Sequence, residues 1–136
     1  MATEITVSLG ETPYLTTADN GRHIFYIDEP LSAGGGDTAP DPMEMLLASL
    51  GSCSLITMKM YATRKEWLIR SMKMKLSIST ERTADGQRSV IHRHIIIDGD
   101  LDEQQRERIV HISKQCPVAR VLSGNVNIET EIEPAN

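Results

Sequence analysis

The sequence predicts an α+β fold with the element order βββ-α-ββ-αα-β, in which antiparallel sheets pack on a buried central helix in one domain spanning residues 1–136. Three observations predict it. Short runs that alternate apolar and polar residues occur near both ends of the chain and in a hairpin pattern in between. One long apolar helical pattern separates the first strands from the hairpin. Helical patterns that are grouped between strands, rather than alternating with them, are typical of α+β domains.

The N-terminal part predicts three short strands followed by a long loop. Ile5, Val7 and Leu9 alternate with polar residues, a second strand is expected near residues 14–17, and a third over residues 23–28 after a turn. The segment 28–41 is rich in glycine and proline, which excludes regular structure. A loop of this length is typically a lid, a binding loop or a flexible excursion.

The central helix has a clear start signal in Asp41-Pro42-Met43-Glu44, with Asp as the N-cap, Pro at the first helical position and Glu at the third. From Met45 to Met58 the pattern contains no charged residue, and it continues to Ala62. A helix that is apolar nearly all round is buried on most sides, here between a sheet and another layer or a second subunit. Gly51 costs about 1 kcal/mol in a helix interior, so a close packing contact is expected there.

The second half of the chain predicts five further elements. They are strands at Met72–Ser79 and Ser89–Asp98 joined by a turn at residues 84–87, a helix at Asp102–Lys114, a helix at Pro117–Ser123 ended by Gly124, and a strand over Val126–Ile132. The longer of these two helices is amphipathic and is expected to turn Ile109, Val110 and Ile112 inward.

Composition and charge exclude several classes of function. The chain has 14 basic and 19 acidic residues, a net charge of −5, without a basic cluster, so no nucleic-acid partner is expected. The N-terminus shows neither a basic nor an apolar leader region, and the most apolar stretch, 43–60, is interrupted by polar residues. A cytoplasmic protein without a signal peptide or a membrane span is therefore expected.

Two cysteines carry the most chemical information. Cys53 and Cys116 lie 63 positions apart, which excludes a Cys-x-x-Cys motif and leaves either two inert buried thiols or a redox pair. Cys116 directly precedes Pro117, so it is expected to be a helix N-cap, where unpaired N–H groups stabilise a thiolate. Cys53 lies in mid-helix and would need a cation from another segment. Arg22, just after a turn, is a candidate; the alternative is an ordinary solvated turn residue.

Other patterns predict less. His92 and His94 share one face of a strand and could chelate a metal, but no further ligand completes the set, so a polar outward face is the favoured interpretation and no metal is expected. Ser52 and Ser54 lack a nearby histidine or acid that would indicate a serine nucleophile.

The stretch from Asp41 to Cys53, together with Cys116-Pro117-Val118 opening a later short helix, resembles the OsmC/Ohr family of osmotically inducible and organic hydroperoxide resistance proteins. The resemblance covers essentially the whole chain. It implies an intertwined homodimer with active sites between subunits, which reduces organic hydroperoxides through thiols. Carried over, Cys53 is the peroxidatic and Cys116 the resolving cysteine.

The same resemblance implies roles for two charged residues. Arg22 matches the arginine that activates the thiolate. The family's glutamate stands ten residues before the first cysteine, where this chain has Met43, and the nearest acid, Glu44, is the candidate for its role.

In the implied reaction the Cys53 thiolate attacks the peroxide and becomes a sulfenic acid, Cys116 forms a disulfide with it, and an external dithiol such as a lipoyl protein reduces the disulfide. No bound cofactor is expected. Two other functions fit the same residues: a non-catalytic dimer of this fold that binds a small molecule in an apolar cleft, and a general disulfide-exchange protein.

Overall fold

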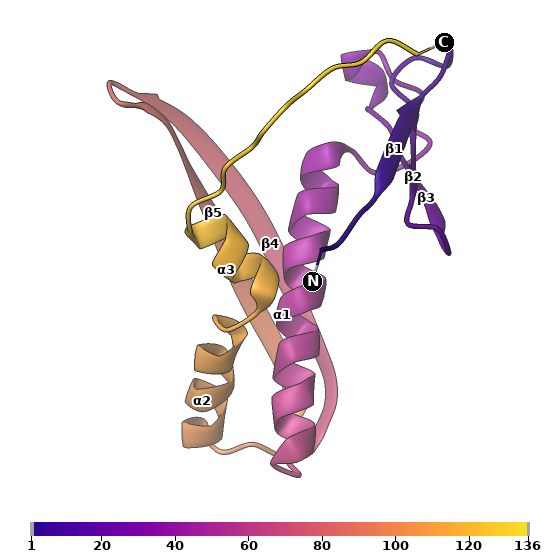
Figure 1. The fold of residues 1–136 in the computed structure, drawn as a ribbon. Helices are drawn as coiled ribbons and strands as arrows, with labels where there is room; N and C mark the ends of the chain where they lie inside the picture. The colour runs from indigo at the N-terminus through magenta and orange to yellow at the C-terminus, as the bar shows by residue number, and fades with distance from the viewer. Residues whose placement is uncertain (1, 136) are drawn as a thin grey trace. The chain divides into compact units, whose positions relative to one another are not determined.

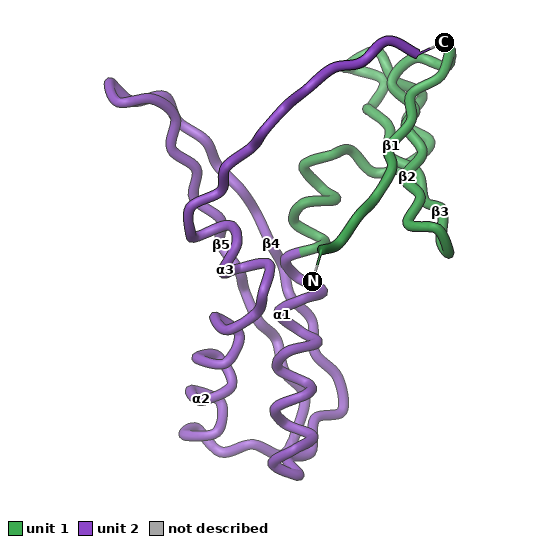
Figure 2. The backbone as a smooth tube through the Cα atoms, viewed as in Figure 1, with its two compact units in different colours: residues 1–49 green, residues 50–136 purple. Residues whose placement is uncertain are grey.

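The computed structural model describes residues 2–135 and divides the chain into two compact units, residues 1–49 and 50–136, whose boundary lies inside one helix (Figure 2). The mixed α+β architecture with antiparallel sheets confirms the expected fold class.

The first unit contains a three-stranded antiparallel sheet in the order β1-β2-β3, with β1 at Thr6–Leu9, β2 at Thr16–Asp19 and β3 at Ile24–Ile27 (Figure 1). The second strand begins two residues later than the sequence pattern indicated. Tyr14 has a φ of 62°, a left-handed conformation that an extended strand cannot contain, so the strand starts after it.

The loop that follows β3 is anchored by a buried carboxylate. Asp28 accepts hydrogen bonds from the backbone N–H of Glu29 at 2.8 Å and from the Thr38 N–H and hydroxyl at 3.1 and 2.7 Å. Its own N–H donates to the Pro40 carbonyl at 3.0 Å, and a short 3-10 helix, η1 at Leu31–Ala33, fills the space between. The loop is therefore tied at both ends rather than a flexible excursion.

Helix α1 runs from Pro42 to Arg64 and begins as the sequence predicts. The Asp41 carboxylate accepts the Glu44 N–H at 2.8 Å, and the Glu44 carboxylate accepts the Asp41 N–H at 3.0 Å, which is a capping box. α1 has the length and apolarity of a membrane span, a test that the core helices of soluble proteins also pass.

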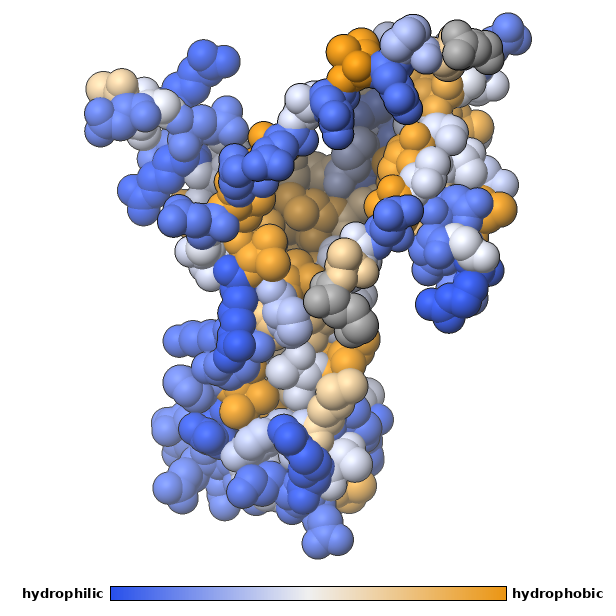
Figure 3. Space-filling model, viewed as in Figure 1, coloured by the Kyte–Doolittle hydropathy of each residue, from blue (hydrophilic) through white to orange (hydrophobic). Residues whose placement is uncertain are grey.

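The burial of α1 differs from the expectation. The helix is covered on one side only. Its buried residues share this face, and they are Leu50, Gly51, Ser54, Met58 and Ala62. Ile56 and Met60 are 54% and 62% exposed, so the expectation of burial on most sides is wrong for the single chain. Figure 3 shows that hydrophobic residues are exposed on the surface of the single chain. The packing contact expected at Gly51 is confirmed, because a Cβ there would lie 2.8 Å from Leu76 Cδ1.

The second unit is built on a long antiparallel hairpin of β4 (Ile69–Thr83) and β5 (Gly86–Gly99). Half-buried residues alternate along both strands, which turns one face of the hairpin toward the helices. A small core joins the elements, with Met58 and Ala62 from α1 packed against Ile69 of β4 and Ile109 of α2.

Two shorter helices complete this unit, α2 at Glu103–Ser113 and α3 at Pro117–Ser123. An Asp102–Gln105 capping box starts α2, and Gly124 caps α3 as predicted. Ile109 is buried, but Val110 is 43% exposed, so the expectation that it faces inward is wrong. The adjacent position on a helix is rotated by about 100°, which carries Val110 off the covered face.

The predicted last strand does not form in the described chain. Residues 125–135 carry no regular structure, and Ile128 and Ile132 are 83% and 98% exposed. A strand requires a neighbour for its N–H and C=O groups, and no described segment pairs with this one. The observed order is thus βββ-α-ββ-αα, with the final strand missing.

Candidate active site

The two cysteines come together within the second unit, although 63 positions separate them in the sequence. α1 carries Cys53, and the turn between α2 and α3 carries Cys116. Each thiol affects the pKa of the other, and both are free rather than bridged.

Cys116 is the N-cap of α3, as the sequence predicted. Its backbone is extended, with φ −67° and ψ 137°, and Pro117 occupies the first helical position. The Cys116 Sγ accepts the backbone N–H of Ala119 at 3.3 Å. The side chain is completely buried, whereas Cys53 is partly exposed. An incoming molecule therefore meets Cys53 first.

Behind the thiols lies a polar connection that the sequence did not reveal. The Ser54 hydroxyl, one residue after Cys53, lies 3.6 Å from Cys116 Sγ and 2.8 Å from the carbonyl oxygen of Leu50. The Arg93 guanidinium on β5 donates to Ser54 Oγ at 2.9 Å and to the Ser113 carbonyl at 3.2 Å. A cation is thus linked to the buried thiol through one hydroxyl.

The surroundings shift the pKa values of the two thiols in opposite directions. Burial raises the pKa of Cys53, and the neighbouring Cys116 raises it further, against the opposing effect of the Val118 N–H. Burial also acts to raise the pKa of Cys116, but hydrogen bonds from the Ala119 N–H and the Ser54 hydroxyl, together with the neighbouring Cys53 side chain, outweigh it and lower this pKa below its usual range. The negative charge of the reduced pair therefore favours Cys116.

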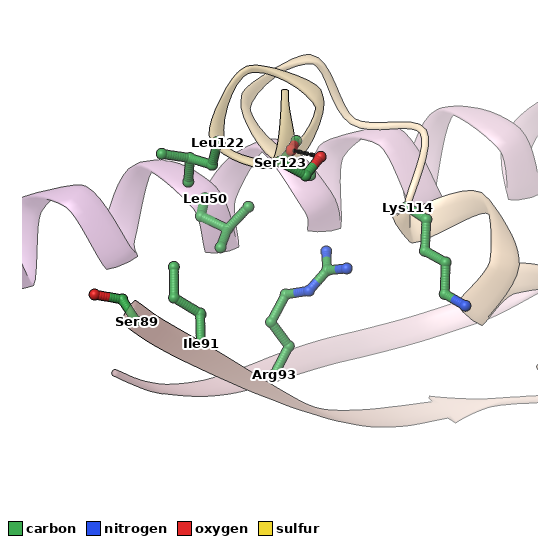
Figure 4. Close-up of a pocket in the computed structure, with 8 residues that line it drawn as sticks. Leu50, Ser89, Ile91, Arg93, Lys114, Leu122 and Ser123 are labelled. Carbon is green, nitrogen blue, oxygen red and sulfur yellow. Dashed lines mark hydrogen bonds between the residues drawn. The ribbon is translucent and has the colours of Figure 1, made fainter. Parts of the chain in front are cut away.

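An open cavity of about 520 Å³ adjoins this connection (Figure 4). Arg93 points into it from β5, and Leu50 and Leu122 face it from α1 and α3. Lys114 stands at another side of the cavity. The cavity therefore combines an apolar lining with two cations, which suits an apolar molecule with an anionic or polar end.

The other predicted site residues lie in the first unit. Arg22 is exposed after the turn, and its backbone N–H donates to Asn20 Oδ1 at 2.9 Å. The Glu44 carboxylate is held in the capping box of α1. The proposed roles of both residues toward Cys53 stay predictions.

The histidine pair behaves as the favoured interpretation indicated. His92 and His94 are exposed on β5, opposite Ser77 and Lys75 of β4. Among residues 2–135, no group of three or more His, Cys, Asp or Glu side chains is placed to hold a metal ion.

A signal for Arg93 was nonetheless present in the sequence. Along β5 the inward positions read Ile91, Arg93, Ile95 and Ile97, so one charged residue stands in an apolar series. A charge at an inward position requires a buried partner, and this residue type marks a polar site. Ser54 carries no comparable signal, because its partners Cys116 and Arg93 come from distant parts of the sequence.

Comparison with known proteins gives consistent results. The model of the family described as OsmC-like protein matches residues 34–131. Protein YhfA of Escherichia coli strain K12 is 32% identical over 106 residues, covering 76% of this chain and 79% of YhfA. The crystal structure of an OsmC-like protein from Mycoplasma pneumoniae superposes with a TM-score of 0.77 at 27% identity, covering 91% of this chain and 89% of that one. The organic hydroperoxide resistance protein OhrB of Bacillus subtilis shares the fold with a TM-score of 0.67 at 20% identity and 98% coverage of both chains.

Proposed function

Because the chain belongs to the OsmC-like protein family, we propose that it is a thiol-dependent peroxidase that reduces organic hydroperoxides with Cys53 and Cys116. The observation that carries the proposal is a pair of free cysteines that affect each other's pKa, one of them partly exposed and the other buried. Fold relatives that are named organic hydroperoxide resistance proteins support the choice of substrate class.

The proposed cycle has three steps. The Cys53 thiolate attacks the distal peroxide oxygen, so that an S–O bond forms, the O–O bond breaks, and the alcohol leaves after taking up a proton. Cys116 then attacks the sulfur of the Cys53 sulfenic acid, forming the disulfide and releasing water. An external dithiol, for which a lipoyl protein is our candidate, reduces the disulfide by exchange and restores both thiols.

Exposure and burial support this order of events. Cys53 is the accessible sulfur, and the fully buried Cys116 is suited to a reaction inside the protein, with the neighbouring sulfur. Arg22 is proposed to stabilise the Cys53 thiolate, and Glu44 to orient Arg22, although its carboxylate also caps α1. We propose that the active form is a cytoplasmic homodimer.

Intact-mass spectrometry with a sulfenic-acid trap tests the cycle. Cys53→Ser should form no sulfenic acid, whereas Cys116→Ser should consume one equivalent of peroxide and stop as a trapped Cys53 sulfenic acid. Turnover of an organic hydroperoxide should then be compared with dihydrolipoamide, glutathione and thioredoxin as reductants. A wild-type protein whose thiols oxidise no faster than free cysteine would exclude the peroxidase.

The adjoining cavity supports a second candidate, a non-catalytic dimer that binds a small apolar molecule. This function leaves the thiols without a chemical role. It predicts that Cys53→Ser retains full ligand binding and that peroxide does not consume the two thiols. Disulfide chemistry without a preference for peroxides would instead indicate a general disulfide-exchange protein.

A further inference from the structure

Arg93 carries a charge that no acid among residues 2–135 neutralises. The side chain is half-buried on the inward face of β5, where the other inward positions are isoleucines. Both ion pairs formed within the described residues involve Arg70. A guanidinium that is partly removed from water needs polar partners, and an anionic partner stabilises it most. The charge of Arg93 is therefore available to an anion from outside the chain.

The hydrogen bonds of Arg93 occupy one nitrogen of the guanidinium. Arg93 Nη1 donates to the Ser54 hydroxyl oxygen at 2.9 Å and to the Ser113 carbonyl at 3.2 Å, which uses both of its protons. Within the described chain, Nε and Nη2 have no acceptor, and no fully buried side-chain nitrogen lacks one. These two nitrogens are therefore in contact with solvent.

The open edge of the guanidinium has the geometry of an oxoanion site. The N–H groups of Nε and Nη2 point the same way from one side of the planar group, and the two oxygens of a carboxylate match them. The two bonds of Nη1 already hold the side chain in place. Little side-chain freedom remains to be lost when an anion binds, which favours affinity.

The cavity beside this edge indicates what else the ligand carries. Its volume of about 520 Å³ is within the range of small-molecule sites. Arg93 points into it, and apolar side chains from three elements face it, namely Leu50 of α1, Ile91 of β5 and Leu122 of α3 (Figure 4). A small inorganic anion would leave this apolar lining uncovered, and a neutral apolar molecule would leave the cation without a partner.

The remaining charge of the lining has the same sign. Lys114 stands at another side of the cavity, and the eight described residues that line it include no acid (Figure 4). Lys114 is exposed, so solvent screens its charge more than that of the half-buried Arg93. We expect Lys114 to attract an anion and Arg93 to bind it.

From this geometry we propose that the cavity between α1, β5 and α3 binds an amphiphilic carboxylate. The carboxylate is held by the Nε and Nη2 edge of Arg93, and the apolar chain lies along Leu50, Ile91 and Leu122. The proposal goes beyond the peroxidase, because neither cysteine lines the cavity. The site would serve a protein with inert thiols as well as one with reactive thiols.

The first test measures the binding of three probes to the wild-type protein by titration calorimetry. Octanoate carries both features of the proposed ligand, 1-octanol has the chain without the charge, and acetate has the charge without the chain. We expect octanoate to bind at least about tenfold more tightly than either control, because a hydrogen bond to a charged group contributes about 1.5–3 kcal/mol. Absence of octanoate binding would overturn the proposal. Equal affinity for 1-octanol would show an apolar cavity without recognition of the charge, and equal affinity for acetate an adventitious ion only.

Substitutions then locate the ligand. Arg93→Gln should weaken octanoate binding by about tenfold and leave 1-octanol binding unchanged, whereas Lys114→Gln should weaken octanoate binding by only about twofold. Leu122→Trp should weaken the binding of both probes, because the larger side chain fills the cavity. Arg88→Gln, an exposed change on the same strand as Arg93, is the matched control. Equal octanoate affinity in wild type and in a folded Arg93→Gln protein would contradict the proposal.

A spectroscopic test keeps the proposal falsifiable if Arg93→Gln does not fold. The side-chain Nε–H signal of Arg93 is observed in the nuclear magnetic resonance spectrum of the wild-type protein and is assigned by its loss in Arg93→Lys. Octanoate should shift this signal and slow its exchange with water, while the Nε–H signal of Arg88 stays unchanged. A signal that saturating octanoate leaves in place would overturn the proposed contact.

None of these measurements uses peroxide, so the two proposals fail independently. A protein that binds octanoate through Arg93 and is not oxidised by peroxide would disprove the peroxidase and retain the carboxylate site. Rapid oxidation by peroxide without octanoate binding would do the reverse.

Discussion

Arg22 is the residue whose proposed role depends most on the family and least on its own surroundings. It is exposed in a turn, and the hydrogen bonds of that turn involve its backbone N–H. We predict that Arg22→Ala slows the oxidation of Cys53 by about tenfold, because loss of a nearby cation raises the pKa of a thiol by about one unit. Rapid-mixing kinetics with an organic hydroperoxide measure this, and Arg82→Ala in the hairpin serves as the control. An equal rate in both variants would leave Arg22 as an ordinary turn residue.

The fluorescence of Trp67 can show how far a structural change at the two cysteines extends into the protein. It is half-buried after the end of α1 and packs edge-to-face on Tyr61, with ring centroids 5.5 Å apart. Its partial exposure is consistent with the charged residues that precede it in the sequence. We predict that disulfide formation between the cysteines leaves its fluorescence almost unchanged. Strong quenching on oxidation would mean that the rearrangement reaches the core around Met58.

For single residues, the sequence predicts the roles that depend on neighbouring residues in the chain. The N-cap position of Cys116 follows from the adjacent proline, and the capping role of Glu44 from its spacing to Asp41. The contact of Ser54 with Arg93 could not be predicted, because 39 positions separate the two residues and only the packing of α1 on β5 brings them together. Local patterns contain no information about such a pairing.

Among the elements, the loop after β3 depends on one carboxylate. The Thr38 hydroxyl, followed by the Glu29 and Thr38 backbone N–H groups, lowers the pKa of Asp28 in the folded protein. A lowered folded-state pKa stabilises the fold above the unfolded value of about 3.9, and this contribution is lost as the pH falls through the folded value. We predict that Asp28→Asn destabilises the protein at neutral pH and removes this part of its acid sensitivity.

Thermal unfolding followed from neutral to acidic pH checks this, with Asp85→Asn in the exposed hairpin turn as the control. The unfolding midpoints of wild type and Asp28→Asn should converge as the pH falls. Limited proteolysis should also cleave the loop faster in Asp28→Asn. Parallel pH curves with a constant offset would show that Asp28 acts without its charge.

The elements also show where sequence patterns are sufficient. α1, α2 and α3 were predicted nearly to the residue because caps and prolines define their ends. The strand at Val126–Ile132 has an equally clear alternation but remains unpaired, since a strand exists only with a neighbour. The alternating pattern predicts that such a segment can form a strand. Whether it does so depends on a free sheet edge with which its backbone can pair.

For the whole molecule, the unpaired C-terminal segment and the open side of α1 are both surfaces that lack a cover in the single chain. We predict a homodimer that measures about twice 15.1 kDa by light scattering at micromolar concentration. Ile128→Pro should weaken it, because proline removes a backbone donor from the proposed strand, and Ile128→Val should not. A monomeric wild type would contradict both the dimer and an active site between subunits.

The hairpin of β4 and β5 has a consequence for the motions of the molecule. Its base packs on the core through Met72, Met74, Ile95 and Ile97, whereas residues 79–89 near the turn are exposed on both strands. A bare two-stranded ribbon is only marginally stable in water, so its far end should open many times while its base stays closed. Amide hydrogen exchange along β4 should therefore be slow near Met72 and quicken steadily toward Thr83, with the mirrored order along β5. The hairpin would then fray from its turn while its base stays paired. Substitutions near Ala84 should therefore alter hydrogen exchange near the turn without changing the surroundings of the thiols.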